Sequence, residues 1–485
     1  MITKIPQEVK DVMKALVDAG FEAYIVGGCV RDLTIDHEPK DWDITTNAHP
    51  HEVQALFPES FYENDFGTVG VKVAPFLSVG KSDREHDVIE VTTYRIESTY
   101  SDRRRPDDVQ FAKTLMEDLS RRDFTMNALA LDINNNLIDP FDGQKDTRDH
   151  IIRCVGDPQE RFEEDALRMI RAVRFAARLN FTIEENTFNA IKEKDALLMH
   201  VSMERIRDEF TKIVMSDHVA HGIQMLYDTG LLTHFLPELI HGVDVEQNHH
   251  HTLTVWEHSL QAVQTCPSKK LEVRLATLFH DIGKPEAKQG TGRDCTFYNH
   301  EYISARMTKT ILHRLKFPKK VIDKTVLLVR NHMFYYSVDE VTETAVRRII
   351  TKVGLENMKD LMDVRIGDRL GSGTKKAKPY KLRHFEYMID KVSHDPVSVK
   401  MLKLNGDIMI KDLKFTPGPQ IGAILNVLLA EVIDNPAKNT LEQLSARALL
   451  LKDENLATLV NLAKDKIEEK RCEEDQDIKK KHWVS

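Results

Sequence analysis

Short apolar runs alternate with amphipathic segments over the first 145 residues. Five runs have the length and composition of strands, at 22–26, 41–45, 69–73, 88–93 and 128–133. A helical spacing of apolar positions covers 7–19. This alternation predicts one mixed sheet flanked by helices.

Beyond residue 158 the apolar spacing becomes helical and stays so to the C-terminus. Helices are predicted at 163–179, 187–194 and 202–215. Residues 371–381 are small, polar and basic, which indicates a linker or loop, and the charged last twenty residues predict a solvated or frayed helix. We therefore expect an α/β head (1–145) followed by three all-α segments: a neck (146–220), a body (221–395) and a tail (396–485).

The composition narrows the class of protein. Hydrophobic residues make up 41% and charged residues 30% of the chain, and no apolar run approaches the ~20 residues of a membrane span. Five scattered cysteines without a C-x-x-C pair disfavour a disulfide framework and indicate a reducing cytoplasm. The net charge of −9 means that any nucleic acid must bind through local basic patches.

A carboxylate pair follows a glycine turn in the head. Asp41 and Asp43 would point to one face of a strand, where two carboxylates suit Mg²⁺. Upstream, Gly27-Gly28 lets the backbone approach a phosphate, and Arg31 offers a forked donor. Taken singly, such pairs are mostly solvated surface and such glycines mostly tight turns. Together they predict two-metal nucleotidyl transfer, in which a third carboxylate, Glu90 in preference to Asp87, completes the site.

One predicted helix carries a row of charged side chains beside its apolar stripe. Asp165 could accept a hydrogen bond from a base, and Arg168 could donate one to it. This combination suits cytosine and adenine and rejects uracil and guanine. Glu164 lies one turn before Arg168 and can pair with it. A solvated face with ion pairs is the alternative. The row continues at steps of three through Arg171 and Arg174.

These pieces and the stretch between them resemble the class II (bacterial-type) tRNA nucleotidyltransferase and poly(A) polymerase family. The resemblance implies that Asp41 and Asp43 bind metal and that Asp123 lies near the ribose. It further implies that Asp165 and Arg168 read the base, with Arg171 and Arg174 nearby. Around the triphosphate it implies Gly28, Arg31 and Arg122. The matching pieces are GGCVRD (27–32), DWDITT (41–46), TYSDRRRPDDVQF (99–111), EDLSRRDFTMNALA (117–130), EEDALRMIRAVRF (163–175) and SMERIRDEF (202–210).

The resemblance favours full CCA addition to tRNA from CTP and ATP. The segment 99–111 resembles a flexible loop that CC-adding enzymes lack, and 404–433 resembles a tail that grips tRNA. Addition of A alone and poly(A) synthesis stay open. Candidate basic patches for RNA lie at 103–105, 168–178, 375–381 and 411–414.

A histidine pattern in the body resembles the HD metal-dependent phosphohydrolases. The resemblance implies a divalent ion (Mn, Fe, Co, Ni or Mg) held by His258, His280, Asp281 and Asp368. His300 and His332 could extend this site, and the triplet 249–251 competes with His258 as the source of the first ligand. The alternatives are a degenerate HD fold that only binds tRNA, or an HD phosphohydrolase whose N-terminal half only binds RNA.

Overall fold

The computed structural model describes residues 5–64, 67–75, 86–97, 109–248, 253–338, 340–374, 377–393 and 399–484. The chain divides into two compact units, Met1–His332 with Asp363–Gly373, and Met333–Met362 with Thr374–Ser485. The division into head, neck, body and tail stays a prediction, and these names are kept for the four segments defined above. Among the described helices, none combines the length and the apolar character that a membrane crossing requires.

A seven-stranded sheet lies at the centre of the head, in the order β3-β4-β5-β2-β1-β8-β9. β2 and β5 run parallel and the other neighbouring pairs run antiparallel, so the sheet is mixed, as predicted. The strands are β1 Ala23–Val26, β2 Asp43–Thr46, β3 Ser60–Asn64, β4 Thr68–Val73, β5 Asp87–Thr93, β8 Ala130–Leu131 and β9 Leu137–Ile138.

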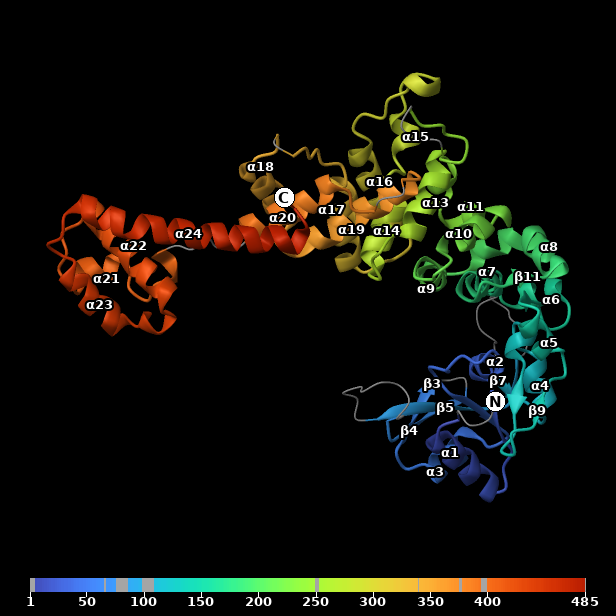
Figure 1. Cartoon of the computed structure of the whole chain (residues 1–485). Coiled ribbons are helices and arrows are strands. Elements are labelled where there is room, and N and C mark those ends of the chain that lie inside the picture. The colour runs from blue at the N-terminus through green and yellow to red at the C-terminus, as the bar shows by residue number, and fades with distance from the viewer. Residues whose placement is uncertain are drawn as a thin grey trace. The chain divides into compact units, whose positions relative to one another are not determined.

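The two faces of this sheet have different chemistry. Ile44 and Val91 lie in one buried apolar cluster with Leu16 of the first helix. Because neighbouring residues of a strand point to opposite faces, Asp43 and Glu90 face the other way. Figure 1 shows α1 and α3 below the strands in this view. The head helices are α1 Gln7–Asp18, α2 Gly28–Thr34, α3 Pro50–Leu56, α4 Leu115–Ser120 and α5 Gly143–Arg148.

Two strand predictions need correction. β2 begins at Asp43, so Asp41 lies in a bend before the strand, and the predicted strand at 128–133 is reduced to β8. Four short strands, too short for alternation to reveal, form two further two-stranded sheets. They are β6 Arg95–Glu97, β7 Val109–Phe111, β10 Ile151–Ile152 and β11 Thr182–Ile183.

The chain after the head is helical, as predicted, but the helix expected at 163–179 is interrupted. α6 ends at Glu164 and α7 begins at Leu167. The neck contains α6 Pro158–Glu164, α7 Leu167–Leu179, α8 Glu185–Lys194 and α9 Met203–Val214, and α10 Val219–Asp228 begins at its end and lies mostly in the body. The body helices of the first unit are α11 Leu232–Phe235, α12 Pro237–Ile240, α13 Val255–Thr265, α14 Leu271–Phe279, α15 Lys284–Ala287, α16 His300–Arg314 and α17 Lys319–Asn331.

The second unit has its own core, in which α22 packs along α24. The predicted frayed C-terminus is helical as far as His482, where Asp390 of α20 pairs with Lys481 (2.6 Å) and His482 (2.8 Å). α19 Leu355–Gly371 contributes residues to both units. The other helices are α18 Glu343–Val353, α20 Tyr380–Ser393, α21 Gly406–Lys411, α22 Pro419–Asp434, α23 Leu441–Leu450 and α24 Leu456–His482.

Candidate functional site

The glycine turn between β1 and α2 brings a carboxylate and an arginine together. Gly27 has φ of 81°, a left-handed conformation that favours glycine. A Cβ atom built on Gly27 would lie 3.1 Å from Nη1 of Arg122 and 3.6 Å from Oδ2 of Asp43. The turn, the arginine and the carboxylate, which are far apart in sequence, therefore meet at one point. Gly28 lies beside the guanidinium of Arg31 in the same turn.

The register of the sheet places a second carboxylate beside Asp43. Asp43 of β2 pairs with Glu90 of β5, so both side chains lie on the same face, whereas Asp87 pairs with Val73 further along β5. Asp41 is exposed and lies outside the strand, so the predicted strand geometry of the D-x-D pair is wrong. Among the described residues, Asp41, Asp43 and Glu90 do not form a group whose ligand atoms all lie within 4.8 Å.

Two carboxylates, buried Asp118 and half-buried Asp32, hold the arginines of the head. Asp118 accepts hydrogen bonds from Arg121 (2.7 Å) and Arg122 (3.2 Å). Burial raises the pKa of Asp118, but these two arginines outweigh it and lower the pKa below its ordinary value. Arg31 is 3% exposed and donates to Asp32 (2.6 Å) and to Asn127 (2.8 Å). Arg31 and Arg122 are thus held in place before any phosphate binds.

Asp123 connects the head to the neck. Its Oδ2 accepts from Nε (2.9 Å) and Nη2 (2.5 Å) of Arg171, and its Oδ1 accepts from Asn127. Burial disfavours the charged carboxylate, but Arg171 and Asn127 outweigh it and lower the pKa of Asp123 to about 2. Arg174 is buried against Glu209 (3.0 Å) rather than solvated, and burial lowers its pKa to about 10. The charged row on this helix is therefore part of an internal network at these positions, and not the solvated face that was the alternative.

The interruption between α6 and α7 determines where Asp165 points. Asp165 has φ of −142° and ψ of 101°, so it does not share a helix face with Arg168, contrary to the prediction. Its Oδ1 accepts from the backbone N–H of Leu167 (3.0 Å), and its Oδ2 accepts from Arg205 of α9 (2.7 Å). Arg168 pairs with Glu164 at 2.6 Å, as predicted, and donates to the carbonyl of Arg121 (3.1 Å).

Sequence reasoning missed three side chains of this region. Arg205 lies in a segment that matched the family, but no role was assigned to it. Asn127 lies in another such segment, where a polar residue among buried neighbours was the available signal. Phe175 looked like an ordinary core residue. The Cζ atoms of Arg174, Arg31 and Arg171 lie 4.0, 5.4 and 5.7 Å from the centre of its ring.

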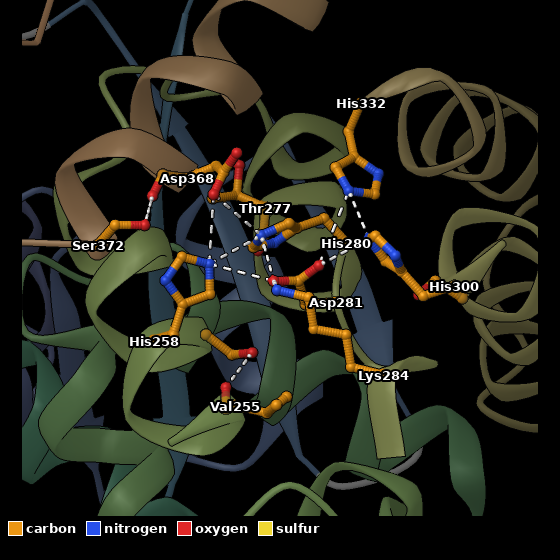
Figure 2. Close-up of polar contacts among 12 residues, drawn as sticks. Val255, His258, Thr277, His280, Asp281, Lys284, His300, His332, Asp368 and Ser372 are labelled. Atoms are coloured by element: carbon orange, nitrogen blue, oxygen red, sulfur yellow. Dashed lines mark hydrogen bonds and ion pairs between the residues drawn. The ribbon is translucent and has the colours of Figure 1, made fainter. Parts of the chain in front are cut away.

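Four histidines and two aspartates converge in the body (Figure 2). His258 of α13, His280 after α14 and Asp368 of α19 form one group whose ligand atoms lie within 4.8 Å of one another. Asp281, His300 and His332 form a second such group, and these two are the groups found in the described part of the chain. The sequence-predicted set is therefore brought together, with His300 and His332 added. The triplet 249–251 lies outside the described residues.

Asp281 belongs to the second group and also contacts the first. Its Oδ2 is 3.2 Å from Nε2 of both His258 and His280, and its Oδ1 is 3.2 Å from Nε2 of His300. His332 lies 3.8 Å from the same Oδ1. One carboxylate oxygen thus faces each group, and the donor set of imidazole nitrogens and carboxylate oxygens fits divalent transition metals.

The electrostatics of this cluster are those of a cation site. Burial lowers the pKa of His280, but Asp281 and Asp368 outweigh it and raise the pKa to about 10. Burial and the neighbouring His280 lower the pKa of His332 to about 3. The carboxylates thus favour positive charge at His280, whereas burial disfavours it at His332. Lys284 also contributes a charge, 2.7 Å from Asp281.

Three family descriptions match the chain. The poly A polymerase head domain matches residues 23–153, the probable RNA and SrmB-binding site of polymerase A matches 180–241, and the HD domain matches 248–370. Nucleotidyltransferase and HD domains use divalent metal ions in general.

Curated relatives match about half of the chain. The CCA-adding enzyme of Lactobacillus helveticus (strain DPC 4571) is 49% identical over 234 residues, which are 47% of this chain and 56% of that protein. The CCA-adding enzyme of Lactococcus lactis subsp. lactis (strain IL1403) is 45% identical over 242 residues, 49% of this chain and 58% of that protein. The matches therefore span somewhat more than half the length of these relatives.

Solved structures match nearly the whole chain. The CCA-adding enzyme of Bacillus stearothermophilus in complex with CTP is 27% identical, with a TM-score of 0.59, covering 92% of this chain and 96% of that one. The Thermotoga maritima CCA-adding enzyme complexed with tRNA has 19% identity and a TM-score of 0.51, covering 93% and 97%, a likeness of fold alone. In sequence, the chain is therefore similar to the poly A polymerase head domain and its RNA-binding segment over residues 23–153 and 180–241, and to HD domains over residues 248–370.

Proposed function

We propose that the protein adds CCA to the 3′ ends of tRNA, without a nucleic-acid template, from CTP and ATP. The observation that carries the proposal is the meeting of Gly27, Asp43 and Arg122, with Glu90 beside Asp43 on the next strand. A close backbone, a cation and paired carboxylates are what a metal-bound triphosphate requires. The curated relatives named CCA-adding enzymes support this choice over addition of A alone or poly(A) synthesis.

Asp41, Asp43 and Glu90 would hold Mg²⁺, because their oxygens are the ligands that this ion prefers. When bound, Mg²⁺ supplies activation of the attacking hydroxyl and charge neutralisation at the departing pyrophosphate. Arg31 and Arg122 bind phosphate oxygens, and Gly27 and Gly28 leave room for them. Asp123, held by Arg171, orients the ribose.

Asp165 and Arg168 choose the base. The Asp165 carboxylate accepts from the exocyclic amine of cytosine or adenine, and Arg168 donates to the adjacent ring nitrogen. Uracil and guanine present the reverse pattern and would leave buried groups unpaired. Glu164, Arg171 and Arg174 support these side chains, and Arg205 fixes Asp165 at 2.7 Å.

A primer comparison tests the proposal. One tRNA ends at the discriminator base and another ends in CC, and each is incubated with Mg²⁺ and CTP alone, ATP alone or both. CCA addition predicts that CTP alone extends the first tRNA by two nucleotides and that ATP alone extends the second by one. Extension of the second tRNA alone would identify an A-adding enzyme, long products would identify a poly(A) polymerase, and no extension would refute the proposal.

A matched pair of variants ties the activity to the head. Asp43→Asn should abolish extension, because one carboxylate of the metal site becomes a neutral amide. Asp149→Asn changes an exposed carboxylate after α5 and should extend tRNA at the wild-type rate. Equal activity of the two variants would contradict the assignment of Asp43.

The two donor groups around Asp281 favour a second function. We propose that the HD segment hydrolyses phosphomonoesters or 2′,3′-cyclic phosphates at RNA ends. His258, His280, Asp281 and Asp368 would hold a divalent ion (Mn, Fe, Co, Ni or Mg), and His300 and His332 extend the donor set. Such an ion supplies an activated water and charge neutralisation on the phosphate.

Metal content and hydrolysis test this second function together. The double variant His280→Ala with Asp281→Ala should lose bound metal, measured by elemental analysis, and lose hydrolysis of a 3′-terminal cyclic phosphate. It should keep nucleotide addition. Asp41→Ala, in contrast, should lose nucleotide addition and keep the hydrolysis. Loss of both activities in either variant would contradict two separate sites. An unchanged metal content would contradict the ligand assignment.

The partners and compartment follow from the proposed reaction. tRNA, CTP and ATP are the substrates, and the tail segment 404–433 is proposed to bind tRNA. The five free cysteines, four of them buried, fit a reducing compartment, and we propose the cytoplasm. The segments 99–108 and 375–376, which were singled out for the loop and for RNA binding, lie outside the described residues.

A further inference from the structure

The hairpin of α16 and α17 has a charge opposite to that of the whole chain. Residues 300–332 contain eight lysines and arginines but only two carboxylates, Glu301 and Asp323, in a chain of net charge −9. A local excess of this size is the electrostatic footprint of a polyanion site. Neither the predicted basic patches nor the two candidate sites account for it.

Four lysines of this hairpin have no carboxylate within ion-pair distance among the described residues. They are exposed and lie at Lys309, Lys316, Lys319 and Lys320. The hairpin arginines, in contrast, pair with Glu286, Glu238 and Glu301. The lysine charges are therefore available to a partner.

Exposed aromatic rings accompany these charges. Tyr302, Arg306 and Lys309 follow one another at helical spacing on the exposed face of α16. Tyr298 is 72% and Tyr302 is 55% exposed, and Cζ of Arg330 lies 3.0 Å from the centre of the Tyr302 ring. Lysines next to exposed aromatic rings are the combination that binds single-stranded nucleic acid, because every base can stack and every nucleotide carries a phosphate.

The two ends of the hairpin lie near the two candidate sites. His300 and His332, at one end, belong to the HD donor set. At the other end, the carbonyl of Lys316 accepts a hydrogen bond from Arg207 of α9 (2.6 Å). The same helix carries Arg205, which binds Asp165. The 15 residues of α16 span about 22 Å at 1.5 Å per residue.

We propose that this surface, which we call the basic strip (Tyr302, Arg306, Lys309, Lys316, Lys319 and Lys320), binds the backbone of a single-stranded RNA 3′ end. The strip gives the RNA end a charged path between the nucleotide-adding site and the HD site. This inference rests on the proposed function, since it takes RNA 3′ ends as the substrate of both sites. A negatively charged protein is the competing occupant.

Fluorescence anisotropy with a labelled single-stranded RNA 12-mer tests the strip. The variant Lys309→Glu, Lys319→Glu, Lys320→Glu is compared with Lys145→Glu, Lys192→Glu, Lys269→Glu, three exposed lysines of the head, neck and body. We expect the strip variant to bind at least tenfold more weakly. Its affinity should also depend less on salt. The plot of log affinity against log salt should be shallower by about 2, since each of the three lost phosphate contacts contributes roughly 0.7 to the slope. The control variant should stay within about twofold of wild type.

Each other outcome decides against the strip. Unchanged binding by the strip variant, equal weakening of both variants, or no binding by the wild type would overturn it. Competition by polyglutamate as strong as that by RNA, at equal charge, would assign the surface to an acidic protein. Circular dichroism confirms that both variants are folded.

Nucleotide addition by the same wild-type preparation separates the two proposals. Absence of addition to tRNA lacking CCA overturns the proposed function, whatever the anisotropy shows. Addition accompanied by unchanged binding of the strip variant overturns the strip alone.

Discussion

Asp123 is a buried carboxylate whose negative charge is stabilised in the folded protein. Its folded pKa of about 2 lies below the ordinary value of 3.8, because Arg171 and Asn127 outweigh the effect of burial. A group with a lowered folded pKa contributes stability above its unfolded pKa and loses that contribution as the pH falls toward the folded value. The stabilisation by Asp123 is therefore present at neutral pH and disappears between about pH 4 and pH 2.

Asp123→Asn should lower the free energy of unfolding by about 2 kcal/mol at pH 7, and by progressively less below pH 4. Urea unfolding at several pH values measures this difference. The emission of Trp42, which is buried in the head, reports it in a Trp256→Phe, Trp483→Phe background. A difference that is the same at pH 7 and pH 3 would contradict the charge argument.

Local pairs could be predicted at this scale, and distant pairs could not. The Glu164–Arg168 pair follows from a four-residue spacing on one helical turn, and the structure confirms it at 2.6 Å. The Asp123–Arg171 and Asp165–Arg205 pairs join residues 48 and 40 positions apart. No spacing rule predicts such contacts, because they depend on how the helices of the neck pack.

At the scale of elements, the turn before α2 constrains which residue can occupy position 27. Gly27→Ala would both strain a backbone with φ of 81° and push a methyl group against Arg122 and Asp43. We expect nucleotide addition to fall at least a hundredfold, with a loss of stability of about 1 kcal/mol from the backbone alone.

Gly156→Ala is the matched control for that substitution. Gly156 has φ of 72°, but a Cβ atom there meets nothing within 4 Å. It should show the same loss of stability and keep wild-type addition. Equal loss of activity in both variants would show that strain, and not crowding of the site, explains the effect of Gly27→Ala. Initial rates with CTP and thermal unfolding provide the two measurements.

The link between α9 and the α6–α7 interruption makes a prediction about nucleotide choice. Arg205→Ala removes a charged hydrogen bond from Asp165, and we expect the preference for CTP over UTP, as a ratio of kcat/KM, to fall about tenfold. Glu204→Ala, at the exposed neighbour of Arg205 on α9, is the control and should keep the preference. A fall in kcat for all nucleotides alike, with the preference unchanged, would assign Arg205 a merely structural role.

Periodicity predicts elements well where they are long. The apolar spacing predicted α1, α8 and α9 to within two residues, because each buries a continuous stripe. It missed the interruption at Asp165, where no glycine or proline marks a break and tertiary bonds hold the extended residue. It also misplaced the start of β2, since Trp42 continues the apolar pattern before the ladder begins.

At the scale of the whole molecule, alternation followed by helical spacing was enough to predict an α/β head and a helical remainder. The contacts that complete the second unit were not predictable from it. Asp390 of α20 pairs with Lys481 and His482 of α24, and Tyr387 bonds to Asp475. These contacts join residues on the two sides of the predicted boundary at 395.

Two fragments test whether the tail folds by itself. The tail 396–485 contains its own apolar cluster and should unfold cooperatively in urea. A fragment of residues 377–485 adds α20 and its bonds to α24, and should have a higher midpoint and more helical circular dichroism. Equal midpoints would show that α20 does not stabilise α24. A non-cooperative transition in the shorter fragment would contradict an independent tail.

The position of Asp165 between two helices has a consequence for the evolution of specificity. Its carboxylate is aimed by an amide of α7 and by a guanidinium on α9, not by the face of a single helix. A small rotation of α9 would therefore redirect it without any change in the residues that touch a nucleotide. Directed selection for an altered nucleotide alphabet should accumulate substitutions along the buried side of α9, beyond the reach of the incoming base.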